Sequence, residues 1–217
     1  LLLVFLQGVW LKAEALRGGE RRSLFSAVLG EKRTYTLYLP EAGTGPDHCA
    51  RPLIVVVDGN DFADIVASTC RYLASVGRMP SGVVVGVDAA DRWRDYTPTR
   101  ANIPDGTPLP TSGGGASFRS FLVQDLIPAI GSIHPVSPFV VVFGHSVAGL
   151  AAVDALLEDP EHVAGAIASS PSLWWDGEYT LRRLKERPSA FRKEQYLFLS
   201  MGGEGDTMLL PAKRFRD

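Results

Sequence analysis

The sequence has few cysteines, little net charge and no apolar run long enough to span a membrane, and each of these absences excludes a class of protein. Cys49 and Cys70 are too few for a disulfide scaffold and lack the spacing of a zinc site, although they could pair with each other in an oxidising compartment. The formal net charge of −2 provides no overall basic field to hold nucleic acid or an anionic membrane. A stable membrane anchor is not expected either, because the apolar start of the chain is far shorter than the roughly 20 residues that span a bilayer.

The composition that remains is that of an ordinary folded protein. Apolar residues make up 46% of the chain and charged residues 21%, which argues against disorder. A chain of 217 residues is long enough for one α/β domain with a core of its own and short for two. We therefore expect a single domain over residues 16–217.

The two ends of the chain have unusual sequences. Residues 1–6 (LLLVFL), followed by AEA at 13–15, resemble the apolar core and cleavage site of a signal peptide. We interpret residues 1–15 as a signal-peptide remnant, with an ordinary first strand or helix as the alternative. This favours a secreted or periplasmic protein, with a cytoplasmic one as the alternative. The other end follows an apolar stretch without a helix-ending signal, so we expect the domain to be incomplete at its C-terminus.

Short β-branched runs alternate with helical patterns along the chain, which predicts a mostly parallel sheet with helices on both faces. Strands are expected at 24–29, 34–39, 53–57, 83–87, 139–143, 163–168 and 196–200, and helices at 62–75, 117–130, 147–157 and 180–186. The first two strands are separated by a turn at 30–32 and should form an antiparallel hairpin. Residues 88–115 have neither the helical nor the strand period, so they form either a functional loop or a disordered segment. We favour the functional loop.

The strongest chemical signal lies where an apolar strand meets a helix of small residues. There the sequence GHSVA at 144–148 resembles the G-x-S-x-G turn that exposes a nucleophilic serine, with alanine in place of the last glycine. Ser146 is therefore the predicted nucleophile, and a serine that merely caps the next helix is the alternative. Its oxyanion hole would use the backbone N–H of Val147 and that of Asn60, whose turn follows the third strand. A plain turn with Asp61 as the helix cap is the other interpretation of that segment.

Five motifs in order make the resemblance specific. They are VDGN at 57–60, RWRDYTP at 92–98, SGGG at 112–115, GHS at 144–146 and SSPSLWW at 169–175. Together they resemble the putative-esterase family of α/β-hydrolases, which includes esterase D, bacterial mycolyltransferases and, closest in pattern, the ferric-enterobactin esterases. The resemblance implies an α/β-hydrolase fold, a Ser–His–acid or Ser–His mechanism through an acyl-enzyme, and neither metal nor cofactor.

The family's chain order places the acid after the seventh strand. Glu204 is our choice and Asp206 the reserve, with solvent-facing carboxylates as the alternative interpretation of both. The loops at the same edge also supply the predicted substrate contacts. These are Arg92 and Arg94, which could hold an anionic or catecholate group, and Trp174 and Trp175, which could stack on an aromatic acyl group. Surface ion pairs and aromatic packing are the alternatives for these two pairs.

The predicted base is missing from the expected place. The resemblance implies a histidine after the acid, but none of the four histidines, His48, His134, His145 and His162, follows Glu204. His145 adjoins Ser146 and should pack behind the site, while the other three lie where the chain enters a strand, at the wrong edge of the sheet. We expect the last strand, the base and the last helix to follow, with a histidine about 30 to 80 residues further on.

Without a base the 217 residues alone should be nearly inactive, since the analogous loss in a serine protease costs on the order of 10⁶ in turnover. The sequence thus predicts a serine esterase that acts on a small-molecule ester. A non-catalytic binding module on the same fold and an acyltransferase are the alternatives.

Overall fold

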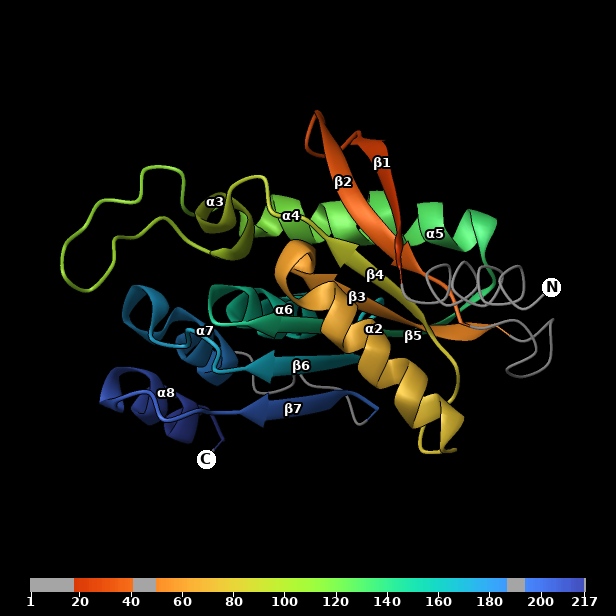
Figure 1. Ribbon diagram of the computed structural model, residues 1–217. Helices are drawn as coiled ribbons and strands as arrows, with labels where there is room; N and C mark the ends of the chain where they lie inside the picture. Colours follow the sequence, from red (N-terminus) through yellow and green to blue (C-terminus); the bar gives the residue numbers. More distant parts are fainter. Residues whose placement is uncertain (1–17, 41–49, 187–193, 217) are drawn as a thin grey trace, which may run out of the picture.

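The computed structural model describes residues 18–40, 50–186 and 194–216, which form one sheet of seven strands covered by helices (Figure 1). The strands are β1 (Glu20–Ser26), β2 (Glu31–Tyr38), β3 (Arg51–Val57), β4 (Val83–Val87), β5 (Val136–His145), β6 (Gly165–Ser169) and β7 (Tyr196–Ser200). Their order in the sheet is β1-β2-β4-β3-β5-β6-β7. β1 pairs antiparallel with β2, and β2 antiparallel with β4, while all other neighbours are parallel. The predicted hairpin and the mostly parallel sheet are confirmed.

The hairpin turn differs from the prediction by a few residues. Ser26 pairs with Glu31, so the turn comprises residues 27–30 and β1 begins at Glu20. Gly30 closes the turn with φ +67°, a left-handed conformation that glycine adopts without a steric penalty. The first residues of β1 are polar, so no apolar run marks the start of this strand.

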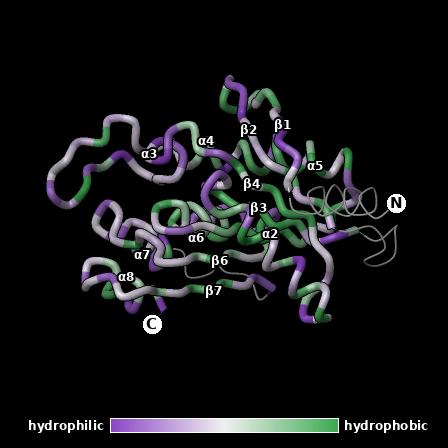
Figure 2. The backbone as a smooth tube through the Cα atoms, in the orientation of Figure 1, coloured by the Kyte–Doolittle hydropathy of each residue, from purple (hydrophilic) through white to green (hydrophobic). Residues whose placement is uncertain are grey.

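The central strands explain why the sheet needs helices on both faces. In β3, Leu53, Val55 and Val57 point into one hydrophobic cluster, and Ile54 and Val56 into another. All five are at most 5% exposed, as expected for a parallel strand buried on both sides. In Figure 2 the hydrophobic colour is concentrated in these central strands.

Two layers of helices cover the sheet. The helical segments are α2 (Gly59–Ser75), α3 (Arg92–Tyr96), α4 (Gly115–Phe121), the π-helix η1 (Leu122–Leu126), α5 (Ile127–Ile133), α6 (Val147–Glu158), α7 (Trp175–Glu186) and α8 (Asp206–Arg216). α2 packs on one face through Ala63 and Ala67, and α4, η1, α5 and α6 pack on the other (Figure 1). The predicted helices at 62–75, 147–157 and 180–186 are confirmed, and the one predicted at 117–130 is the continuous run α4-η1-α5.

Two helices were not predicted. α3 lies within the segment expected to be a loop, where the Asp91 carboxylate caps it by accepting hydrogen bonds from the N–H groups of Trp93 and Arg94. α8 forms because Ala212 and Phe215 are buried in a cluster with the helices beneath them. Tertiary packing, rather than a capping signal, stabilises this last helix.

Some sequence predictions concern segments that the structure does not describe. The proposed signal-peptide remnant at residues 1–15 and the partner cysteine Cys49 lie outside the described residues. Among the helices of the described ranges, none combines the length and the apolar character required to cross a bilayer.

Candidate active site

The loops that follow the parallel strands meet at one edge of the sheet. In Figure 1 the arrowheads of β6 and β7 point towards the side that carries α3, α7 and α8. Backbone hydrogen bonds join these loops: the Ser146 N–H donates to the Ser169 carbonyl at 3.0 Å, and the Ser170 N–H donates to the Ser200 carbonyl at 2.7 Å. The ends of β5, β6 and β7 are thereby held together, at the edge where open α/β sheets bind ligands.

Ser146 occupies a sharp turn between β5 and α6. Its backbone has φ 58° and ψ −120°, a conformation that L-residues rarely adopt and that needs support from its surroundings. Gly144 allows the turn, because a Cβ atom there would lie 2.1 Å from the Ala148 carbonyl oxygen. The strand and the helix therefore approach each other closely at Gly144 and Ala148.

The turn is held from the loop after β6. The Ser146 carbonyl accepts hydrogen bonds from the N–H groups of Leu150 and Ser172, both at 3.0 Å. The hydroxyl oxygens of Ser146 and Ser172 lie 3.5 Å apart, at the limit of a hydrogen bond. Ser146 as a whole is half-buried.

Two helices begin at this edge. Val147 is the first residue of α6 and Asn60 the second of α2, so neither helix uses their backbone N–H groups internally. Helix N-termini carry partial positive charge and favour anions. Before α2, Asp58 adopts a left-handed conformation (φ 58°, ψ 49°) and its carbonyl accepts from the N–H groups of Asp61 and Phe62.

Glu204 lies in the loop after β7 and is half-buried. Hydrogen bonding from the Ser170 hydroxyl lowers its pKa, and backbone N–H groups of this loop act in the same direction. Its Oε2 atom is buried and has no hydrogen-bond partner within the part of the chain that is described. Asp206, the reserve acid, is exposed at the start of α8.

No histidine among the described residues hydrogen-bonds to Ser146 or Glu204. The ring of His145 packs against Phe62, with 5.4 Å between ring centroids, on the α2 side of the sheet. The expectation that His145 lies behind the site stays a prediction. His134 precedes β5 and His162 precedes β6, at the opposite edge, and His48 lies outside the described residues.

The two arginines of α3 are bound to carboxylates of the protein itself. Arg92 binds Asp58 and keeps 45% of its side chain exposed. Arg94 binds Glu31 at 2.6 Å and Asp95 at 2.8 Å. These are the ion pairs that the sequence left open as the alternative, so a substrate contact by either arginine stays a prediction.

The two tryptophans differ in exposure. Trp175 is 1% exposed; its ring stacks on Trp93 at 5.7 Å, and its indole N–H donates to the Thr99 carbonyl at 3.2 Å. Trp174 is half-buried, and its indole N–H points to the Met208 sulfur at 2.9 Å. Of this pair, only Trp174 keeps part of its surface exposed.

The sequence did not single out Ser170 or Ser172, although both contact predicted site residues. Both are buried, and Ser170 has φ 43°, unusual for serine. The Gly202 N–H donates to the Ser170 hydroxyl at 3.2 Å, which joins this loop to the Glu204 loop. Serines spaced within SSPS, directly after a buried strand, were the available signal, since small hydroxyl side chains commonly hydrogen-bond loop backbone.

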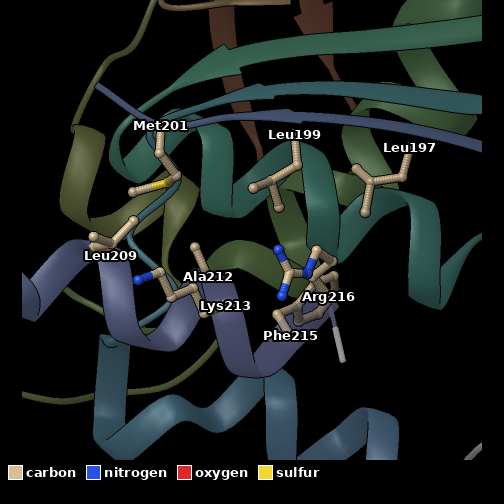
Figure 3. Close-up of a pocket in the computed structure, with 8 residues that line it drawn as sticks. All are labelled: Leu197, Leu199, Met201, Leu209, Ala212, Lys213, Phe215 and Arg216. Atoms are coloured by element: carbon tan, nitrogen blue, oxygen red, sulfur yellow. The ribbon is translucent and has the colours of Figure 1, made fainter. Parts of the chain in front are cut away.

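A separate cavity of about 550 Å³ lies between β7 and α8 and contains none of the predicted site residues (Figure 3). Two cationic side chains, Lys213 and Arg216, line it. The rest of its wall is apolar: Leu197, Leu199, Met201, Leu209, Ala212 and Phe215. It therefore belongs to the packing of α8 on the sheet rather than to the Ser146 site.

Comparison with known proteins gives consistent relatives. Ferri-bacillibactin esterase BesA of Bacillus subtilis is 28% identical over 197 residues, which are 83% of this chain and 68% of BesA. Siderophore triacetylfusarinine C esterase of Aspergillus fumigatus is 31% identical over 157 residues, which are 67% of this chain and 51% of that protein. The chain thus spans only part of the length of each relative.

Solved structures agree on the fold. An IroE-like serine hydrolase from Shewanella oneidensis matches with a TM-score of 0.73 and 25% identity, over 92% of this chain and 78% of its own. The BES protein from Bacillus cereus matches with a TM-score of 0.77 and 24% identity, over 90% of this chain and 80% of its own. The predicted α/β-hydrolase fold is confirmed.

A family model described as "Putative esterase" matches residues 26–210, from the end of β1 into α8. Because this match includes the turns that carry Asn60, Ser146 and Glu204, it covers the whole predicted site. The chain belongs to the Putative esterase family.

Proposed function

We propose that the protein is a serine carboxylic-ester hydrolase with Ser146 as its nucleophile. The observation that carries the proposal is the strained backbone of Ser146 (φ 58°, ψ −120°) at a strand-to-helix turn. Such a backbone supports the proposed nucleophile elbow, a turn that holds the serine hydroxyl clear of the backbone. In the proposed reaction Ser146 Oγ attacks the ester carbonyl, the alcohol leaves, and water hydrolyses the acyl-enzyme.

The N–H groups of Val147 and Asn60 are the proposed oxyanion hole. Both belong to helix starts at the edge where Ser146 lies, and both are free of intrahelical hydrogen bonds. Two such donors stabilise the negative charge that develops on the carbonyl oxygen during attack. Their fixed place at helix N-termini means that little reorganisation is needed when this charge forms.

Glu204 is the proposed acid. Its lowered pKa keeps the carboxylate ionised near neutral pH, and its Oε2 atom, unpartnered among the described residues, can accept an N–H. A histidine base between Ser146 and Glu204 would donate one ring N–H to this carboxylate and receive the serine proton at its other nitrogen. If Glu204 takes no part, a Ser–His dyad performs the same proton transfer.

The proposed substrate is an ester of a siderophore. BesA and the Aspergillus fumigatus relative are named for siderophore esters, and the half-buried Trp174 could stack on an aromatic acyl group. The alternative substrate is a feruloyl ester, which also has an aromatic acyl group but lacks a metal-binding trilactone.

The substrate proposal is tested with the protein produced from its complete gene. We expect linear fragments of a ferric trilactone siderophore by mass spectrometry, formed faster than ferulic acid is released from a feruloyl ester. In ¹⁸O-labelled water the new carboxylate should carry label. Faster feruloyl cleavage would reject the siderophore substrate, and unlabelled product transferred to an added alcohol would identify an acyltransferase. Binding without any product would identify a non-catalytic module.

A secreted or periplasmic location is also proposed, and it rests on the signal-like sequence at residues 1–15. Fractionation of the producing cell tests it. The processed protein should be outside the cytoplasm, and an unprocessed cytoplasmic protein would contradict the proposal.

A further inference from the structure

The turn between β3 and α2 is built around one buried residue, Asp58. Its carboxylate is 1% exposed and accepts hydrogen bonds from Arg92: Nε lies 3.0 and 2.9 Å from its two oxygens, and Nη2 lies 2.7 Å from Oδ2. Its backbone N–H donates to the Tyr96 hydroxyl at 3.0 Å. Its carbonyl accepts from two N–H groups of α2. The backbone and the side chain of Asp58 are therefore both fixed.

This residue needs such support because of its conformation. Asp58 has φ 58° and ψ 49°, in the left-handed region, where a residue with a Cβ atom is strained. A buried carboxylate is in addition unfavourable unless it is paired and hydrogen-bonded. Arg92 supplies the pairing, and the Tyr96 hydroxyl holds the backbone N–H.

The strained turn determines where α2 begins. Gly59 follows Asp58, and a Cβ atom on it would lie 2.3 Å from the Gly86 carbonyl carbon, so the turn is pressed against β4. The next residue is Asn60, whose N–H is the proposed second oxyanion donor. A change in the Asp58 backbone would therefore change the direction of the Asn60 N–H.

Both supporting side chains come from α3, the short helix capped by Asp91. Arg92 is its first residue and Tyr96 its last. Tyr96 is 0% exposed, and burial raises its pKa, so its hydroxyl stays neutral at working pH. The Tyr96 ring contacts Phe118 edge-on at 5.2 Å, which fixes the hydroxyl in the core.

We propose that Arg92 and Tyr96 are positioning residues, which hold Asp58 in its left-handed conformation and so aim the Asn60 N–H at the oxyanion. This inference rests on the proposed function, and it gives Arg92 a role through the protein rather than through contact with substrate.

Kinetics on two esters separate these roles for Arg92. We compare 4-nitrophenyl acetate with the monoanionic 4-nitrophenyl succinate, using the protein from its complete gene. Arg92→Gln should lower kcat at least about tenfold on both esters and change KM less than about threefold, because an oxyanion interaction exists only in the transition state. A loss confined to KM of the anionic ester would overturn the proposal and make Arg92 a substrate contact.

Matched variants test the path of the effect. Asp58→Asn should reproduce the loss, and the double variant Asp58→Asn/Arg92→Gln should lose no more than about twofold beyond either single one. If the kcat losses of the two single variants multiplied in the double variant, the two residues would act independently, which would contradict the proposal. Arg119→Gln is the control, because Arg119 binds Asp154 at 2.6 Å and Asp159 at 2.5 Å in an ion-pair cluster elsewhere. Its kcat per folded molecule should match wild type.

Amide hydrogen exchange tests the turn without any turnover. In Tyr96→Phe and Arg92→Gln the Asp58 amide should exchange at least about tenfold faster than in Arg119→Gln, because its turn opens more readily. Equal exchange in all three proteins would overturn the proposal. Ester turnover retained by Ser146→Ala would instead reject the proposed nucleophile, while the exchange result would still decide whether the turn is held as proposed.

Discussion

The Ser172 backbone N–H donates to the Ser146 carbonyl oxygen at 3.0 Å, while the hydroxyl oxygens of the same two residues are 3.5 Å apart. The backbone contact is a good hydrogen bond and the hydroxyl contact a marginal one. The loop after β6 therefore supports the nucleophile through its main chain, and the Ser172 side chain should contribute little to the attack itself.

Replacing Ser172 with alanine tests this difference. The variant retains the backbone hydrogen bond and loses only the long hydroxyl contact, so kcat/KM for 4-nitrophenyl acetate should change by less than about fivefold, about 1 kcal/mol. A loss of about a thousandfold would mean that the Ser172 hydroxyl takes part in catalysis.

Gly144→Ala should destabilise the protein by about 3 kcal/mol, because the new Cβ atom would lie 2.1 Å from the Ala148 carbonyl oxygen and force the strand and helix apart. Gly131→Ala is the matched control, since its Cβ atom would meet only the Val136 side chain, at 3.5 Å. In helix α5 that change should stabilise by up to about 1 kcal/mol. Urea unfolding measures both, and equal stability of the two variants would contradict the close approach.

Trp174→Ala and Trp175→Ala should differ in kind. Trp175 is 1% exposed, so its truncation should cost about 3 to 5 kcal/mol of folding free energy. Trp174 is half-buried, so its truncation should mainly raise KM for aromatic esters relative to acetate. Thermal unfolding and KM for the two ester types check this. Equal KM increases for acetate and aromatic esters would reject the aromatic contact.

Glu204 should contribute a pH-dependent part of the stability. Its pKa in the folded protein lies below the ordinary value of 4.5, chiefly because of the Ser170 hydroxyl. The ionised form therefore favours folding above about pH 4.5, and this contribution is lost as the pH falls through the lowered pKa. The stability difference between wild type and Glu204→Gln should accordingly shrink from neutral to strongly acidic pH in urea unfolding.

Ser170→Ala provides the control for that prediction. Removal of the hydroxyl should raise the Glu204 pKa towards its ordinary value, which NMR titration of the carboxyl carbon follows directly. An unchanged titration would show that the Ser170 hydroxyl is not the main cause of the lowered pKa.

Much of this fold could be predicted from the sequence. The strands β4 and β7 were predicted to the residue, because short apolar runs of strand length beside glycine-containing segments leave little ambiguity. The strand-to-helix turn at Ser146 was predicted for a similar reason, since GHS stands between such a strand and a helix of small residues.

What could not be predicted depends on contacts between distant residues. α3 has five residues, too few for a periodic pattern, and it forms because of the cap at Asp91 and packing against the core. Arg92 binds Asp58 from 34 residues away, and no local pattern indicated the left-handed conformation of Asp58. The burial of Trp175 likewise involves a distant residue, since its ring stacks on that of Trp93.

The central claim is that Ser146 is the nucleophile of an ester hydrolase. The most direct test is kcat/KM of wild type and Ser146→Ala for 4-nitrophenyl acetate, with the protein from its complete gene and with Ser172→Ala as the control. The account predicts that Ser146→Ala loses at least about a thousandfold while remaining folded, and that Ser172→Ala stays close to wild type. Retention of wild-type activity by folded Ser146→Ala would contradict it.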